Sequence, residues 1–116
     1  MTLNAFIDDQ RRNRYRGNKS KQDETNKCEL IIKSHMNNGL VLQQNDLPVN
    51  IQFVWYRTNR RSDKDNIAFA KKFILDGMVN SGLISNDGWD QIGDFSDSFR
   101  IDRENPRAEV ILKRAE

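Results

Sequence analysis

The sequence predicts a small single-domain α/β sandwich, in which two main helices pack on a mixed β-sheet. One segment alternates apolar and polar residues as a strand does, and two others carry apolar residues at helical spacing. A length of 116 residues suits one modest core, so we expect residues 1–116 to form one domain. The expected order of elements is β-α-β-α-β-β.

The first part of the chain predicts a short strand at residues 2–7, followed by a basic arm at about residues 8–22. The arm is polar and interrupted by Gly17, so we expect a loop or short helix with its cations exposed. Such a run is typical of a solvated segment, and it also suits the neutralisation of nucleic-acid phosphates. Its cations are Arg11, Arg12, Arg14, Arg16, Lys19 and Lys21.

A helix is predicted from Thr25, as its N-cap, to about Asn37, where Asn38 and Gly39 end it. Its apolar stripe consists of Cys28, Ile31, Ile32, His35 and Met36. Because Cys28 and His35 belong to this stripe, we expect both to pack against the core or its boundary.

Residues 49–57 predict a strand with Ile51, Phe53 and Trp55 on one face. Residues 66–81 predict the second helix, with Asp63 or Asp65 capping its start and Gly82 stopping its end. Its buried stripe consists of Ile67, Ala70, Ile74, Leu75 and Met78.

The last part of the chain begins with a turn at Asn86, Asp87 and Gly88. Residues 90–102 and 107–115 then predict two strands, joined as a hairpin around residues 104–106.

Composition excludes several classes of protein. The apolar fraction is 36%, the charged fraction is 31% and the mean hydropathy is −0.84, so we expect a small core and no membrane partner. The single cysteine suits the cytoplasm. No phosphate-binding glycine motif is present, so no nucleotide cofactor is expected, and no set of residues predicts a zinc site or a serine protease triad.

Charge is distributed unevenly along the chain. Residues 1–61 carry 11 Lys and Arg against 6 Asp and Glu, whereas residues 62–116 carry 8 against 11. A basic first half beside an acidic second half favours a polyanionic partner, and the small core favours pairing with a second copy of the chain.

Four aspartates stand within twenty-five residues: Asp63, Asp65, Asp76 and Asp87. Converging carboxylates repel one another unless a cation lies between them, and Mg²⁺ takes oxygen ligands. The nearby cations Arg60, Arg61, Lys71 and Lys72 would attract a polyanion to the same place. Carboxylate-bound Mg²⁺ beside a lysine is suited to phosphodiester hydrolysis.

Each aspartate also has an ordinary structural explanation. Asp63 and Asp65 suit a helix start, Asp76 an ion pair with Lys72, and Asp87 a turn. A helix of about sixteen residues is about 24 Å long. The turn that carries Asp87 must therefore fold back along a strand, or reach from a partner subunit, to join Asp63.

The stretch RRSDKDNIAFAKKFILDGMVNSGLISNDGWDQI resembles the RusA family of Holliday-junction resolvases, in the branch found in Gram-positive phages and prophages. The family pattern is an Asp-x-Asp-Asn that opens a helix, a lysine and an aspartate along it, then a glycine and an acidic turn. The segments LNAFIDDQRRNRYRGNKSK and ENPRAEVIL also look like this branch, so the resemblance covers nearly the whole chain.

The resemblance implies a RusA-like fold and a homodimer that cuts opposing strands of a four-way DNA junction in a bacterial host cell. It implies that Asp63, Asp65 and Asp87 are catalytic and bind Mg²⁺ or Mn²⁺, that Asp76 is a candidate outer ligand, and that Lys72 is the catalytic lysine. The helix before Asp76 is about one turn longer than in the best-known branch, so the choice of Lys72 over Lys71 depends on its distance from Asp76. Phosphate contacts are expected from the arm, Arg60, Arg61 and Lys71.

Two other hypotheses remain at this point. The chain is a protein that binds branched DNA without cutting it, or a structural or regulatory phage protein whose acids only cap and solvate. Four aromatic residues, Trp55, Phe69, Phe73 and Trp89, suit wedging between DNA bases, although packing in a core or an interface is the stronger expectation for each.

Overall fold

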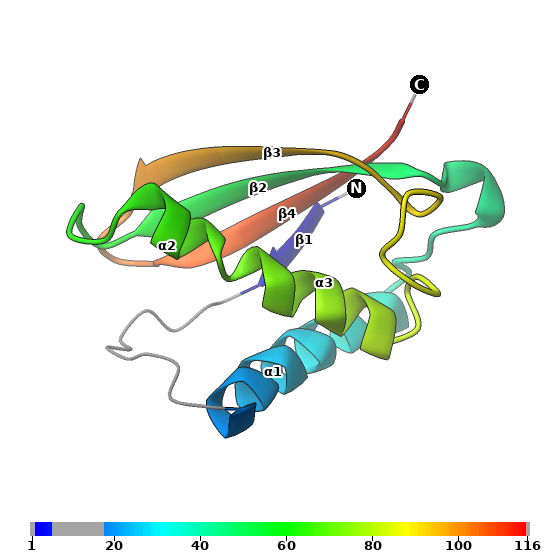
Figure 1. Cartoon of the computed structure of the whole chain (residues 1–116), viewed down its shortest axis with the longest axis horizontal. Coiled ribbons are helices and arrows are strands. Elements are labelled where there is room, and N and C mark those ends of the chain that lie inside the picture. Colours follow the sequence, from blue (N-terminus) through cyan, green and yellow to red (C-terminus); the bar gives the residue numbers. More distant parts are fainter. Residues whose placement is uncertain (1, 6–17, 116) are drawn as a thin grey trace.

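A computed structural model describes residues 2–5 and 18–115. The elements are labelled in Figure 1. The strands are β1 (Thr2–Ala5), β2 (Val49–Arg57), β3 (Ile92–Ile101) and β4 (Arg107–Arg114). The helices are α1 (Asn18–Asn37), α2 (Lys64–Ala68) and α3 (Lys71–Asn80), with a short 3₁₀ helix, η1 (Gln44–Asp46).

The four strands form one mixed sheet in the order β1-β4-β2-β3. β2 pairs antiparallel with β4, with Phe53 opposite Val110, and parallel with β3, with Trp55 opposite Phe99. β2 spans the nine residues predicted from its alternation. The predicted α/β class with a mixed sheet is confirmed.

The predicted hairpin between the last two strands is wrong. β3 and β4 lie on opposite sides of β2, and the segment between them crosses the end of that strand. Asn105 and Pro106 correctly indicate that the chain changes direction there. A change of direction does not determine which strands pair with each other. The apolar β2 gains most from a central place, because both of its edges are then paired.

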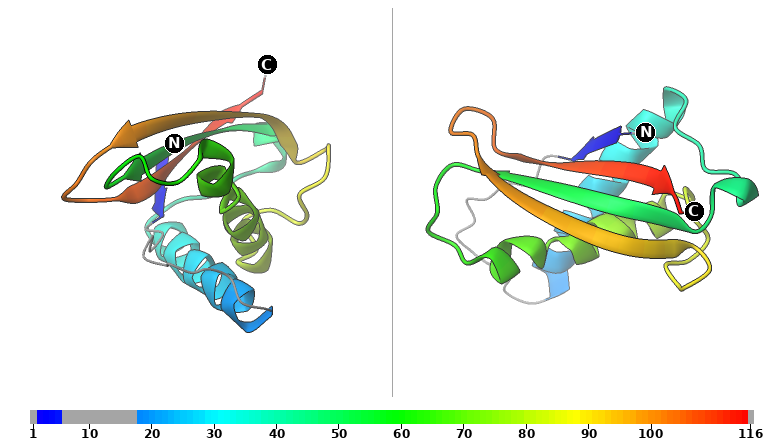
Figure 2. Two further views of the ribbon diagram at one scale, coloured as in Figure 1. Left: turned by 60° about the vertical axis from the view of Figure 1, so that its left-hand side comes forward. Right: turned by 90° about the horizontal axis from the view of Figure 1, so that it is seen from above.

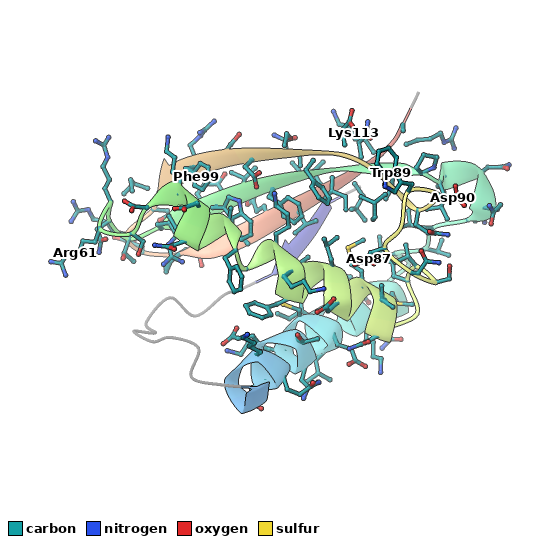
Figure 3. The ribbon with its side chains drawn as sticks, in the orientation of Figure 1. Arg61, Asp87, Trp89, Asp90, Phe99 and Lys113 are labelled. Atoms are coloured by element: carbon teal, nitrogen blue, oxygen red, sulfur yellow. The ribbon has the colours of Figure 1, made fainter. Side chains whose placement is uncertain are left out.

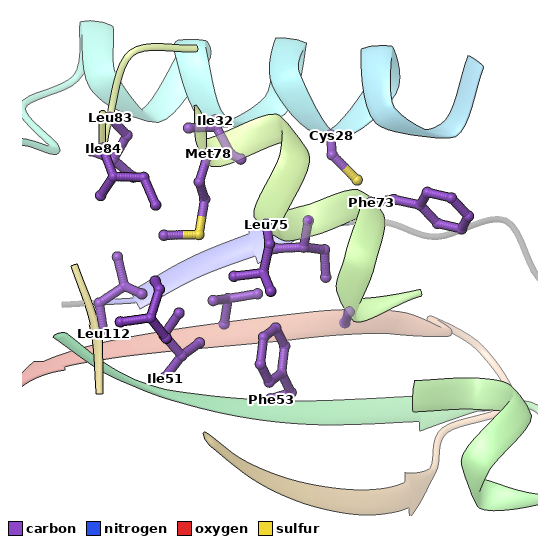
Figure 4. Close-up of a cluster of buried hydrophobic side chains, with 14 of the residues drawn as sticks. Cys28, Ile32, Ile51, Phe53, Phe73, Leu75, Met78, Leu83, Ile84 and Leu112 are labelled. Atoms are coloured by element: carbon purple, nitrogen blue, oxygen red, sulfur yellow. The ribbon is translucent and has the colours of Figure 1, made fainter. Parts of the chain in front are cut away.

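Helices α1 and α3 pack on one face of the sheet (Figures 1 and 2). Buried side chains from both layers meet between them, as Figure 4 shows for Ile32, Met78 and Phe53. At the helix crossing, a Cβ added to Gly77 would lie 2.9 Å from the Cβ of Cys28. Gly77 therefore permits α1 and α3 to approach closely.

Helix α1 begins earlier than predicted, at Asn18 instead of Thr25. Thr25 is 7% exposed in the helix interior, so its prediction as an N-cap is wrong. The preceding Lys, Gln and Glu residues favour helix, and they extend it beyond the apolar stripe on which the prediction depended. Cys28 is buried as expected, and His35 lies at the boundary.

The second predicted helix is divided into α2 and α3 at Phe69 and Ala70. Tighter bonds bridge the break, because the amides of Lys72 and Phe73 donate to carbonyl oxygens three residues earlier. Phe69 is half exposed and meets Phe73 edge to face, with 5.7 Å between the ring centroids. The single helix predicted over 66–81 is therefore wrong, although its buried stripe is largely confirmed.

Both long helices end at a glycine with positive φ, as predicted. At Gly82 (φ +88°) the amides of Gly82 and Leu83 donate to Val79 and Met78. The amides of Gly39 and Leu40 close the end of α1 in the same way. This is the Schellman arrangement, which glycine adopts without steric cost.

No helix within residues 18–115 is long and apolar enough to cross a membrane.

Candidate active site

A cleft of about 780 Å³ opens where β2 and β3 end and α2 begins. These two strands are parallel, and ligands of open α/β sheets bind beyond the carboxyl ends of parallel strands. Four cationic residues line the cleft: Arg57, Arg60, Lys64 and Arg100. Apolar lining comes from Ile67, Phe99 and Ile101, and the acid among the lining residues is Asp63. The arrangement suits an anion with an apolar part, such as a nucleotide unit of DNA.

Asp63 and Asp65 stand at the start of α2, as the sequence predicts. Asp63 is the N-cap residue, and its backbone carbonyl accepts from the amides of Asn66 and Ile67. Its carboxylate makes no capping hydrogen bond, whereas Asp65 Oδ1 accepts from the amide of Asn66 at 3.0 Å. Both residues are exposed, so both carboxylates lie at the surface, Asp63 in the cleft lining itself.

Lys64, between the two aspartates, ties α2 to the sheet. Its Nζ lies 5.4 Å from the centroid of the Phe99 ring on β3. This cation–π contact fixes the acidic start of α2 beside the ends of the strands.

Lys71 occupies a more enclosed place than its neighbour Lys72. Its Nζ donates to Asp97 Oδ2 at 2.9 Å and lies 5.1 Å and 4.8 Å from the ring centroids of Phe53 and Phe95. The other oxygen of Asp97 accepts from Trp55 Nε1 at 2.9 Å. This group, the Lys71–Asp97 pair, joins the start of α3 to β2 and β3.

Asp97 was not predicted from the sequence as a functional or structural acid. The alternation of β3 gives a signal for it, because Asp97 shares its face with Phe95 and Phe99. A charged residue between two aromatic residues on the helix side of a strand needs a partner, and Lys71 provides one.

Lys72 and Asp76 form the exposed i, i+4 ion pair expected from their spacing, with 3.2 Å between Nζ and Oδ1. The Lys72 side chain is 62% exposed, against 20% for Lys71. The catalytic role of Lys72 and the DNA contact of Lys71 stay predictions.

Asp87 lies at the other end of the molecule from the cleft, in the turn between α3 and β3 (Figure 3). Asn86 Oδ1 accepts from the amide of Gly88 at 2.8 Å and shapes this turn. The chain does return toward the cleft along β3. Asp87, however, precedes the first residue of that strand and lies at the end of β3 that is far from the cleft. A nine-residue strand such as β2 is about 26 Å long, and it separates the two ends.

One copy of the chain thus does not bring the four predicted aspartates together. Over the part of the chain that the structure describes, no group of three or more His, Cys, Asp or Glu residues is placed to hold a metal ion. The pair Asp63 and Asp65 still fits Mg²⁺, which proteins often hold through one or two carboxylates together with substrate phosphate.

The remaining candidates differ in what the structure describes. Arg11, Arg12, Arg14 and Arg16 lie outside the described residues, and Lys19 falls in the first turn of α1. Lys21, Arg60 and Arg61 are exposed. Cys28 is not a reactive thiol, because burial raises its pKa to about 12.

Of the aromatic residues considered as wedges, Trp55 and Phe73 are buried, whereas Phe69 and Trp89 are exposed. Trp89 is 97% exposed and follows Asp87 in the turn before β3.

No family model matches this chain, and a search of curated proteins found no match. The resemblance to RusA resolvases therefore rests on the residues quoted above.

Proposed function

We propose that this protein is a metal-dependent endodeoxyribonuclease that resolves four-way DNA junctions by paired phosphodiester cleavage, in the cytoplasm of a bacterial host. One observation supports the proposal above the others. Asp63, with Asp65 two residues on, stands in a cleft lined by four cationic residues beyond the carboxyl ends of two parallel strands.

The residues of the cleft have separate tasks in this proposal. Arg57, Arg60 and Arg100 bind phosphate oxygens, and guanidinium groups suit that contact because they donate two parallel hydrogen bonds. Lys64 adds positive charge and holds α2 against Phe99. The apolar lining provided by Ile67, Phe99 and Ile101 accepts a sugar or base next to the bound phosphate.

Asp63 and Asp65 would hold Mg²⁺ or Mn²⁺. When bound there, the ion would activate water and stabilise the negative charge on the reacting phosphate. By the resemblance, Lys72 stabilises the same charge, Asp87 is a third carboxylate, and the basic arm binds the neighbouring DNA strands.

The test is cleavage of a synthetic four-way junction beside a linear duplex of matched sequence, with Mg²⁺ or with EDTA. We expect paired, metal-dependent nicks in the junction alone, and a loss of at least about 100-fold in rate for Asp63→Asn. Asparagine is also a favoured N-cap residue, so this substitution keeps the start of α2. Asp23→Asn, on the exposed surface of α1, is the matched control and should cut normally.

A second function has an observation in its favour. One copy of the chain places Asp63 in the cleft lining, with Asp65 two residues on, and leaves Asp87 elsewhere, which suits a protein that binds branched DNA without cutting it. If the protein binds the junction tightly but makes no nicks with either Mg²⁺ or Mn²⁺, the proposal of a nuclease is rejected in favour of a DNA-binding module. An absence of both binding and cleavage would reject both proposals.

A further inference from the structure

The apolar lining of the cleft comes from two elements and forms one small surface, which we call the apolar wall: Ile67, Phe99 and Ile101. Lys64 of α2 contacts the ring of Phe99, so the odd-numbered side chains of β3 point toward the helices. Phe99 and Ile101 therefore share one face of the sheet, and Ile67 of α2 completes the wall. Figure 3 shows Phe99 at the same end of the molecule as Arg61, far from Asp87.

The rest of the described chain does not cover this wall. Ile101 is 45% exposed, Phe99 and Ile67 are half-buried, and α2 has no buried residue. A single exposed apolar residue is ordinary at a protein surface, but three together in a concave site are typical of a place that binds an apolar group. The wall therefore indicates a ligand that has an apolar surface of its own.

Positive charge surrounds the wall. Arg57 is paired with Ile101 across β2 and β3, and residues opposite each other point to the same face. Arg100 belongs to the other face of β3, and its guanidinium donates to the Phe99 carbonyl at 2.9 Å. Four cationic residues line the cleft against one carboxylate, that of Asp63, so the lining has a formal charge of +3. The same ligand must therefore carry negative charge next to its apolar surface.

We propose that the cleft binds one unpaired nucleotide of a branched DNA, with its base against the apolar wall and its phosphate among the arginines. The inference rests on the proposed function, because it takes DNA as the ligand. In a duplex the faces of the bases are stacked on one another, and a protein meets only their edges and the backbone. Proteins that hold single-stranded DNA combine cations with aromatic side chains, on which the open face of a base stacks. The cleft volume of about 780 Å³ lies within the usual range for small ligands, about 300–1,000 Å³.

This assignment names the feature of the substrate that the protein recognises. Removing a base from its stack costs free energy, and the cost is least for a base that is already unpaired. A branch point supplies such a base more readily than a continuous duplex does. We therefore expect the protein to bind flaps, forks and bulges that contain an unpaired nucleotide, as well as four-way junctions.

The contribution of the base is tested with three DNA duplexes in EDTA, so that no strand is cut. One is fully paired, one carries a single unpaired adenine nucleotide, and one carries an abasic sugar and phosphate at the same place. The two bulged duplexes have the same backbone charge and differ only in the base. We expect the protein to bind the adenine bulge about 10-fold more tightly than the abasic bulge. Equal affinity for the two bulges would overturn the proposal, because it would show that no base is bound.

The apolar wall is tested with Phe99→Leu and Ile101→Ala. Each should weaken binding of the adenine bulge by at least about 3-fold and leave binding of the abasic bulge unchanged. Ile101 is exposed, so its truncation keeps the core intact even if Phe99→Leu does not fold. Phe95→Leu removes a ring from the same face of β3 outside the cleft lining, and this matched control should keep the preference for adenine. A preference that survives in both wall variants, or that is lost equally in the control, would overturn the proposal.

The position of the base is tested with Phe99→Trp, because stacking on a base quenches the emission of an indole ring. We expect the adenine bulge to quench this variant more than it quenches the wild type, and the abasic bulge to quench both alike. Quenching by adenine in a protein that cuts no junction would reject the nuclease and keep the bound nucleotide. A protein that cuts junctions but shows no such quenching would reject the bound nucleotide alone.

Discussion

At the scale of residues, the Lys71–Asp97 pair shows how a charged group can stabilise a small core. The Asp97 carboxylate accepts from both Lys71 and Trp55, and the Lys71 ammonium lies near two aromatic rings. Such contacts are stronger here than at the open surface, because little water competes for the charges. The adjacent Lys72 also forms an ion pair, with Asp76, but this pair is exposed to solvent.

We expect Lys71→Met to lower the free energy of unfolding by about 1–2 kcal/mol, because it removes a charge-assisted hydrogen bond and the cation–π contacts. Lys72→Met should change it by less than about 0.5 kcal/mol, the usual contribution of an exposed i, i+4 pair. Urea unfolding followed by circular dichroism measures both. Equal losses from the two variants would show that the enclosed position of Lys71 contributes nothing.

At the scale of elements, the crossing of α1 over α3 depends on the lack of a side chain at Gly77. An added Cβ would lie 2.9 Å from Cys28 Cβ and 3.0 Å from the backbone nitrogen of Glu29. Backbone atoms of a packed helix cannot move aside cheaply, so α1 would have to shift as a unit.

Gly77→Ala should therefore lower the free energy of unfolding by about 1–3 kcal/mol through overpacking. The sign is informative, because the same change in an exposed helix raises stability by about 1 kcal/mol. Asn80→Ala, on the exposed face of the same helix, is the control and should leave the unfolding midpoint nearly unchanged. Stabilisation by Gly77→Ala would mean that the two helices are not in close contact there.

The sequence predicts well those elements whose signal is local. The alternation of Ile51, Phe53 and Trp55 defines β2, and Gly39 and Gly82 mark helix ends because only their positive φ closes those turns. The predictions that fail are those that depend on contacts between residues far apart in the sequence. No local pattern reveals that β2 separates β3 from β4, or that Asp87 stays at the far end of a strand from Asp63. The sequence thus predicts half of the candidate site, namely Asp63 and Asp65 beside arginine residues. It does not predict how far Asp87 lies from Asp63.

At the scale of the whole molecule, Arg107 secures the segment that crosses from β3 to β4. Its guanidinium donates to Asp102 and Glu109 and lies 3.8 Å from the centre of the Tyr56 ring. The hydrogen bond from Arg107 lowers the pKa of Asp102 below its usual 3.8. Asp46 is similar, its pKa lowered by the Gln43 amide and by Arg114 of β4.

A lowered pKa in the folded state fixes the sign of the pH dependence. These carboxylates contribute stability above pH 3.8, and the contribution is lost as the pH falls through their lower folded values. We expect Asp102→Asn to unfold more easily than wild type at pH 6 and to lose less stability between pH 5 and about pH 2. Parallel pH profiles of the unfolding midpoint for the two proteins would contradict a role for Asp102 in this dependence.

The order of the strands also has a consequence for the synthesis of the chain. β1 is made first, yet its partner β4 is made last, and β4 must also bind β2. While the ribosome is still extending the chain, α1, β2 and α3 can already pack together, but β1 still lacks β4, the strand with which it pairs. The sheet can close only when the residues of β4 have left the exit tunnel, so the final step of folding joins the first strand to the last.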